Sequence, residues 1–253
     1  MPSPRLRQFA LLLALVVGAQ PFRAAPSTQA AEAPPALRVP VASDEHFVLE
    51  LRMPKDGARP TNAAKPVGAA RWVRRASDGR VQLELEVRFF DEQLRVHHVE
   101  TFGPKGSELV WREWRPGQGR TLHVQLEGGF ARVVEWGGLE AVRERWSAPV
   151  DLVFPLQLVE LSRAGAAPQA WGERGPVRFD PLGRACERVR VVSNSSEASA
   201  SLALLREDGS SAGAFAFANG ALASFAWQAG ELRGRAVDAQ EYAELLAQAE
   251  SAR

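Results

Sequence analysis

Apolar residues recur at every second position along several segments, and this alternation constrains the fold more than any other feature of the chain. In 81–89 the odd positions hold Val, Leu, Leu, Val and Phe, whereas the even positions hold Gln, Glu, Glu and Arg. The same alternation runs through 47–53 and 122–126. Successive side chains of a strand point to opposite faces, so the pattern predicts antiparallel strands with one buried and one solvated face.

Turn sequences separate the alternating segments at intervals of roughly 8 to 12 residues, the spacing of a meander, sandwich or barrel. Asn219-Gly220, between 215–218 and 222–227, is the strongest, because two-residue hairpin turns need positive φ, which Asn and Gly adopt at low cost. No alternation of strands with helices appears, which argues against a parallel sheet. The other predicted turns are Asp78-Gly79, Gly128-Gly129, Gly137-Gly138, Asp208-Gly209 and Ala229-Gly230.

Two segments depart from the alternation and predict helices. The first is 155–163, PLQLVELSR, where proline suits the first helical turn and Gly165 follows the end, although strand spacing fits it nearly as well. The second is 238–250, where Asp238 is a candidate N-cap with Glu241 three residues later. Its apolar residues share one helical face, which we expect to dock on the sheet.

These elements predict a mainly β fold in a single domain over 44–253. We expect an antiparallel meander of about ten or more strands, either a half-barrel or a sandwich, with a short middle helix and a C-terminal helix at 238–250. The length suffices for one sizeable apolar core.

The N-terminal segment resembles a secretory signal. Arg5 and Arg7 precede the apolar run 9–17, and Gly18-Ala19 follows it, so we predict a signal peptide over 1–19. The run is about half the length that a transmembrane helix needs, so we expect no transmembrane anchor in the mature chain. Residues 20–43 are rich in Ala and Pro and predict a disordered leader. The expected location is therefore exported, either periplasmic or extracellular.

Charge and cysteine content exclude several classes of function. The chain has 31 basic and 30 acidic side chains, and removing Arg5 and Arg7 with the signal leaves 29 basic ones. Because basic and acidic charges are almost equal in number, the sequence gives no electrostatic argument for nucleic acid as a partner, or for an anionic membrane. Cys186 is the single cysteine, so no intramolecular disulfide is available and packing must stabilise the fold.

No constellation of residues predicts catalysis. His97 and His98 are neighbours and point to opposite faces of a strand, so they do not chelate one metal. His98 and Glu100 share a face, but two ligands fall short of the three or four that zinc needs. We therefore predict no catalytic residue, no metal and no cofactor, and the interpretation as an enzyme ranks last. Cys186 is expected to be a small, half-buried residue.

The tryptophans are the remaining residues that could indicate a function, because the chain has seven tryptophans and one tyrosine. Trp111 and Trp114 have opposite parity in one strand, so one of them should leave the core face. Filling the core is the simplest role of an indole, and lining an aromatic groove for an apolar or sugar ligand is the alternative. Our candidate ligand-binding residues are Trp111, Trp114, Trp136 and Trp227.

The order of segments resembles that of the exported half-barrel proteins related to the periplasmic carriers of outer-membrane lipoproteins. A signal segment leads into long strands such as VQLELEVRFF and TLHVQLEGGFARVVEW, with PLQLVELSR embedded and a helix EYAELLAQ at the end. The carriers open with an amphipathic helix, whereas 20–40 here is interrupted by prolines. The resemblance implies a curved sheet that holds acyl chains under a helical lid, and it transfers no functional residue.

The leading hypothesis is therefore an exported, non-enzymatic envelope protein that binds an apolar ligand such as a lipid or a lipoprotein acyl chain. The alternative is an exported structural or protein-interaction module with a filled core and no ligand. The candidate partners are an apolar small molecule or lipid, and another envelope protein.

Overall fold

The fold is seen in a computed structural model, and the predicted signal segment 1–19 and the leader up to residue 41 lie outside the residues that it describes. The first strand begins at Ser43, next to the predicted start of the domain. The described residues are 42–51, 66–91, 93–137, 141–163, 171, 175–195, 199–227 and 232–251.

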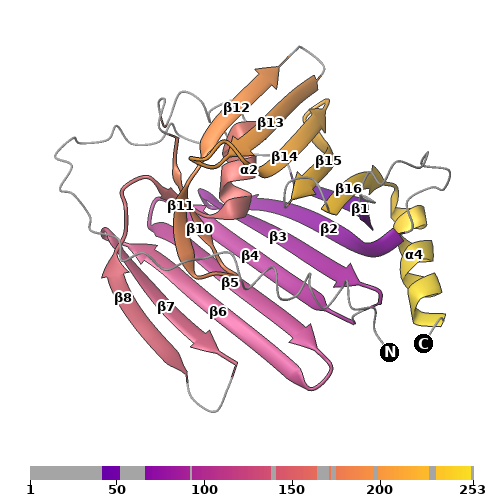
Figure 1. Cartoon of the computed structure of the whole chain (residues 1–253), viewed down its shortest axis with the longest axis horizontal. Helices are drawn as coiled ribbons and strands as arrows, with labels where there is room; N and C mark the ends of the chain where they lie inside the picture. The colour runs from indigo at the N-terminus through magenta and orange to yellow at the C-terminus, as the bar shows by residue number, and fades with distance from the viewer. Residues whose placement is uncertain are drawn as a thin grey trace.

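A single antiparallel sheet of 13 strands dominates the molecule (Figure 1). The chain starts in the middle of this sheet, runs outward from β1 to the edge strand β8, reappears at the opposite edge as β12, and returns to pair β16 with β1. The predicted antiparallel meander is thus confirmed, as an open sheet that does not close into a barrel. Its strands are β1 (Ser43–Leu51), β2 (Pro66–Ser77), β3 (Arg80–Phe89), β4 (Arg95–Gly103), β5 (Gly106–Arg115), β6 (Gln118–Glu127), β7 (Phe130–Trp136), β8 (Val142–Ser147), β12 (Arg190–Ser195), β13 (Ser199–Leu205), β14 (Ser211–Ala218), β15 (Ala221–Trp227) and β16 (Leu232–Val237).

Between the two edges the chain forms a second layer, which we call the inner layer. It consists of a three-stranded sheet and the predicted middle helix: β9 (Leu152–Val153), α2 (Pro155–Arg163), β10 (Val177–Asp180) and β11 (Ala185–Arg188). The short pairing of β9 with β10 is parallel, which the sequence did not predict. Figure 1 shows α2, β10 and β11 lying across one face of the large sheet.

The large sheet bends around α2, and the bend brings residues of distant strands into one apolar cluster there. Leu83 of β3 and Phe215 of β14 belong to the same buried cluster as Leu156 and Leu158 of α2. A second cluster joins Leu109 of β5 to other parts of the inner layer. We call the face toward the inner layer the inner face, and the opposite one the outer face.

The hairpin turns hold the register that assigns each side chain to a face. Asn219 and Gly220 have φ of 50° and 76°, as a type I′ turn requires, and they join β14 to β15 as predicted. The predicted turns Asp78-Gly79 and Gly128-Gly129 also have positive φ at both residues. Ala229-Gly230 lies outside the described residues.

The C-terminal helix is confirmed as α4 (Ala239–Ser251), and it packs on the outer face of β1 and β2. Asp238 caps it, because its Oδ1 accepts a hydrogen bond from the backbone N–H of Glu241 at 2.8 Å. The ring of Tyr242 lies 4.6 Å from that of His46 on β1. The helix therefore docks by its predicted apolar side. No helix in the described ranges is long and apolar enough to cross a membrane.

Candidate functional site

The interface between the inner face and the inner layer is the candidate site, and its central feature is the buried carboxylate of Glu100. This side chain projects from β4 and is 0% exposed. Its Oε1 accepts a hydrogen bond from the backbone N–H of Leu156 at 2.9 Å, and its Oε2 accepts one from Gln157 at 2.6 Å. The first N–H groups of a helix have no partner within the helix and favour negative charge. Glu100 thus caps α2 from the sheet and fixes where the helix begins.

His98 lies beside Glu100 on the same strand face and is also 0% exposed. Its Nε2 is 2.8 Å from Oε1 of Glu100, close enough for an ion pair, but the hydrogen-bond alignment is poor. Its ring stands 5.2 Å from that of Trp111 at a tilt of 57°. Within the described residues, Nδ1 of His98 and Nε1 of Trp111 have no hydrogen-bond partner. Buried polar atoms normally have a hydrogen-bond partner, so these two unpartnered atoms are unusual.

A second polar contact ties α2 to the sheet. Arg74 of β2 donates a hydrogen bond from Nη1 to Oε1 of Glu160 on α2 at 3.0 Å, and their side chains are 11% and 5% exposed. Breaking such a pair from one side is strongly destabilising, because a buried charge loses its partner. The helix is therefore held at its N-terminus by Glu100 and further along by Arg74.

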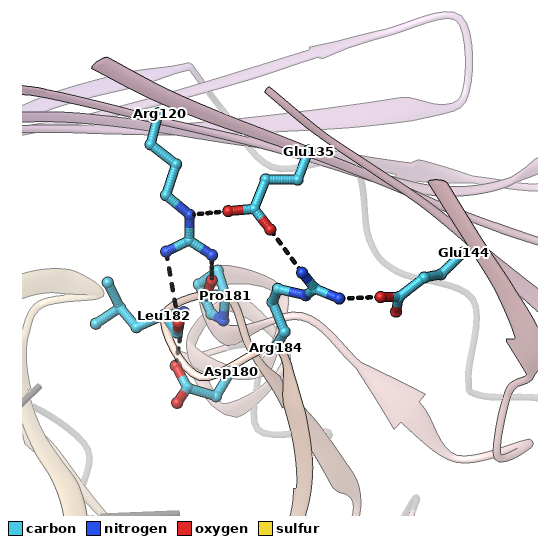
Figure 2. A network of polar contacts seen from close by, with 7 residues as sticks. All are labelled: Arg120, Glu135, Glu144, Asp180, Pro181, Leu182 and Arg184. Atoms are coloured by element: carbon cyan, nitrogen blue, oxygen red, sulfur yellow. Dashed lines mark hydrogen bonds and ion pairs between the residues drawn. The ribbon is translucent and has the colours of Figure 1, made fainter. Parts of the chain in front are cut away.

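An ionic network attaches the far end of the inner layer to the sheet (Figure 2). Glu135 of β7 accepts hydrogen bonds from Arg120 at 2.6 Å and from Arg184 at 2.8 Å. Arg184 lies in the β10–β11 turn and also bonds Glu144 of β8. The Arg120 guanidinium donates to the carbonyls of Pro181 and Leu182 in the same turn, each at 3.4 Å.

The charges of this network shift the pKa values of Glu135 and Arg184. Burial alone would raise the pKa of the Glu135 carboxyl, but the hydrogen bonds and charges of Arg120 and then Arg184 outweigh burial and hold that pKa below its usual range. Burial likewise opposes the charge of Arg184, and its bonds to Glu144 and Glu135 raise the pKa of the guanidinium. Both shifts favour the charged forms of Glu135 and Arg184.

The structure does not bring the four predicted tryptophans together. Trp111 is 7% exposed on the inner face, and Trp227 is half-buried against the cluster around α2. Trp114 and Trp136 lie on the outer face and are 43% and 45% exposed. The predicted separation of Trp111 from Trp114 is confirmed, and no single groove is lined by all four. Whether any of them binds a ligand stays a prediction.

Other potential reactive groups contribute little. Burial raises the pKa of the Cys186 thiol to about 11, so the thiol stays protonated near neutral pH and is a poor nucleophile. Among the described residues, no three His, Cys, Asp or Glu side chains are grouped so as to hold a metal ion. A hollow of about 10 Å³, room for one water at most, lies where α4 ends near β3 and β4. Its lining is Arg88, Phe89, Phe90, Arg95, Leu246, Ala249 and Glu250.

Sequence reasoning noticed His98 and Glu100 as a pair and missed what the pair does. Two polar residues at core positions of β4 were a visible signal, because Val96 and Phe102 flank them on the same face. The helix also lacked an N-cap of its own, since Phe154 precedes Pro155. Together these features indicated a polar residue of the sheet that caps a helix.

Comparison with known proteins finds no matching family model, no similar curated protein and no similar solved structure. The function is therefore argued from the geometry of the interface alone.

Proposed function

We propose that the protein is an exported, non-enzymatic carrier that holds an apolar ligand, such as a lipid or an acyl chain, between the inner face and the inner layer. The observation that carries this proposal is how the inner layer is attached. In the described part of the chain, its three strands form a sheet of their own and share no ladder with the 13-stranded sheet. The layer can therefore separate from the sheet without breaking any strand pairing of the meander.

The buried side chains of α2 are chemically equivalent to the ligand that would replace them. Leu156 and Leu158 are 0% exposed against the inner face, and Val159 and Leu161 are nearly so. Burying apolar surface contributes roughly 25 cal/mol per Å² whether the surface belongs to a side chain or to an acyl chain. An incoming chain would thus recover the apolar part of the free energy that is lost when α2 lifts from the sheet.

Polar atoms at the same interface support a ligand that has a polar end. The unpartnered Nε1 of Trp111 is a donor beside the imidazole of His98. An ester or carboxyl group of a lipid would accept a hydrogen bond from such a donor. Trp72, also on the inner face, has an indole N–H that lacks a partner among the described residues.

A displacement titration tests the proposal. A fluorescent fatty-acid analogue should bind the protein with low-micromolar or better affinity and should be displaced by unlabelled fatty acid. Trp111→Ala should weaken binding about tenfold, because a rigid apolar wall is lost at the interface. Trp114→Ala, three residues away on the outer face, is the matched control and should bind as the wild type does.

Melting curves of the same proteins distinguish a carrier from a structural or interaction module with a filled core. If the wild type binds no analogue below its melting temperature, and Trp111→Ala only lowers that temperature, the carrier proposal is wrong. The protein is then a structural or interaction module of the envelope. That second function is favoured by one observation, the complete burial of Phe154, Leu156 and Leu158.

A further inference from the structure

The outer face of β4–β8 presents aromatic side chains to solvent. Trp114 of β5, Phe130 of β7 and Trp136 of β7 are 43%, 40% and 45% exposed. Strand register places them on one continuous surface, because Trp114 lies opposite Gly119 and Trp136 lies opposite Thr121, two residues further along β6. We call the outer face of β4–β8 the arginine–tryptophan face.

The same register gathers arginines around these rings. The outward positions of β4–β8 hold five arginines and two acids, although the whole chain is almost neutral. One acid, Glu108, is already bound to His123 at 2.5 Å, and the other is Glu127. Four of the arginines are exposed and form no ion pair with any residue that the structure describes: Arg95, Arg112, Arg132 and Arg143.

Two of the five arginines lie so close to each other that their positive charges repel. Arg132 of β7 and Arg145 of β8 are direct cross-strand partners. Like charges directly opposite each other destabilise a sheet. Arg145 places its guanidinium 4.3 Å from the centre of the Phe130 ring, which compensates only in part. A bound anion would relieve this repulsion.

We propose that the arginine–tryptophan face docks on a lipid bilayer that contains anionic lipids. Guanidinium groups bind phosphate with two parallel hydrogen bonds, and tryptophan rings favour the level of the lipid headgroups. A bilayer is an extended surface, and it suits a face to which five adjacent strands contribute. This inference goes beyond the carrier proposal and does not depend on it.

Vesicle binding tests the inference. The full-length protein should float with vesicles of equal parts phosphatidylcholine and phosphatidylglycerol, and much less with phosphatidylcholine alone. An arginine near an anionic surface changes affinity about fivefold, so Arg143→Gln should weaken binding by that factor and the triple change Arg112→Gln, Arg132→Gln, Arg143→Gln by more than about fiftyfold. Arg190→Gln, an exposed arginine on β12, is the matched control and should bind normally. All variants share the same N-terminal residues, so differences between them report on the face.

Two further measurements separate a docking role from a structural one. Arg132→Gln should leave the melting temperature unchanged or raise it, because the change removes a like-charge pair. Trp136→Ala should weaken binding to anionic vesicles several-fold by an amount that does not depend on salt, whereas the arginine effects should shrink as salt rises.

Three outcomes would overturn the inference. The first is no flotation of the wild type with anionic vesicles. The second is an equal loss of binding in Arg190→Gln and Arg143→Gln. The third is arginine-dependent binding to DNA or to an acidic polysaccharide without binding to vesicles, which would assign the face to an anionic polymer instead.

Discussion

The two faces of β4–β8 are built from the same strands, yet they differ in every property that matters for function. On the inner face Trp111, His98 and Leu109 are buried beneath the inner layer. On the outer face their close neighbours in sequence, Trp114 and His97, remain partly or largely in solvent. Alternation separates the two sets, but only the inner layer makes one of them a core. The alternation of residues along a strand therefore defines its two faces but does not specify what each face contacts.

The two tryptophans of β5 should give the largest difference between the faces. Trp111→Ala removes a large buried side chain and should lower the free energy of unfolding by about 3 to 5 kcal/mol. Trp114→Ala removes a side chain that is 43% exposed and should change it by about 0.5 kcal/mol or less. Urea denaturation of both variants measures this contrast, and equal losses would mean that the assignment of faces is wrong.

Two glutamates that each contact a histidine provide a second contrast. Glu100→Gln weakens the cap of α2 and removes a buried charge beside His98, so we expect a loss of about 1.5 to 3 kcal/mol. Glu84 bonds His97 at 2.9 Å on the outer face, and Glu84→Gln should cost about 0 to 1 kcal/mol. Denaturant melts measure both, and a neutral Glu100→Gln would show that α2 begins without help from the sheet.

The register that separates the two kinds of face can itself be disturbed at a turn. Gly220 has a φ of 76°, where a β-branched side chain is strained, so Gly220→Val should cost about 1 to 3 kcal/mol. Gly220→Ala should cost less, because alanine lacks the branched β-carbon. Thermal melts, with hydrogen exchange of β14 and β15, detect a loosened pairing. An unchanged melt would mean that this turn does not hold the register.

Acid should loosen the attachment of the inner layer before the outer hairpins respond. The folded pKa of Glu135 is lowered from the ordinary 4.5, so its stabilising contribution is complete above that pH and is lost as the pH falls through the lower folded value. Hydrogen exchange of the turn 181–184, corrected for the intrinsic effect of pH on exchange, should therefore accelerate as the pH falls below 4.5. Arg184→Gln should show similar acceleration near neutral pH. Uniform acceleration across the turn 78–79 as well would indicate general acid unfolding instead.

The C-terminal helix and the middle helix differ in how far local sequence specified them. For α4, Asp238 and Glu241 form the cap three residues apart, so the sequence predicted both the helix and its start. For α2, the cap is Glu100, which lies 56 residues from Leu156 in the chain. Periodicity could indicate that a helix begins near Pro155, but it could not indicate the carboxylate that fixes it.

The candidate site was predictable to a similar, limited extent. The opposite orientation of Trp111 and Trp114 followed from parity, because neighbours along a strand alternate strictly. The grouping of four tryptophans as one ligand site did not follow, because parity within each strand says nothing about which strand faces share a layer. The overall charge misled in the same way, since a near-neutral chain still places five arginines and only two acids on the outer face of β4–β8.

Local sequence was enough to predict the alternating strands of the meander, the tight turns at 78–79, 128–129 and 219–220, the C-terminal helix and the separation of these strands into two faces. These features depend on φ preferences and side-chain periodicity within a few residues. Three features depend on tertiary contacts: the inner layer covers one face, Glu100 caps α2, and Arg132 and Arg145 stand opposite each other on an open surface. These features depend on which distant segments meet when the sheet bends, and burial acts on the whole chain at once, so no local pattern encodes them.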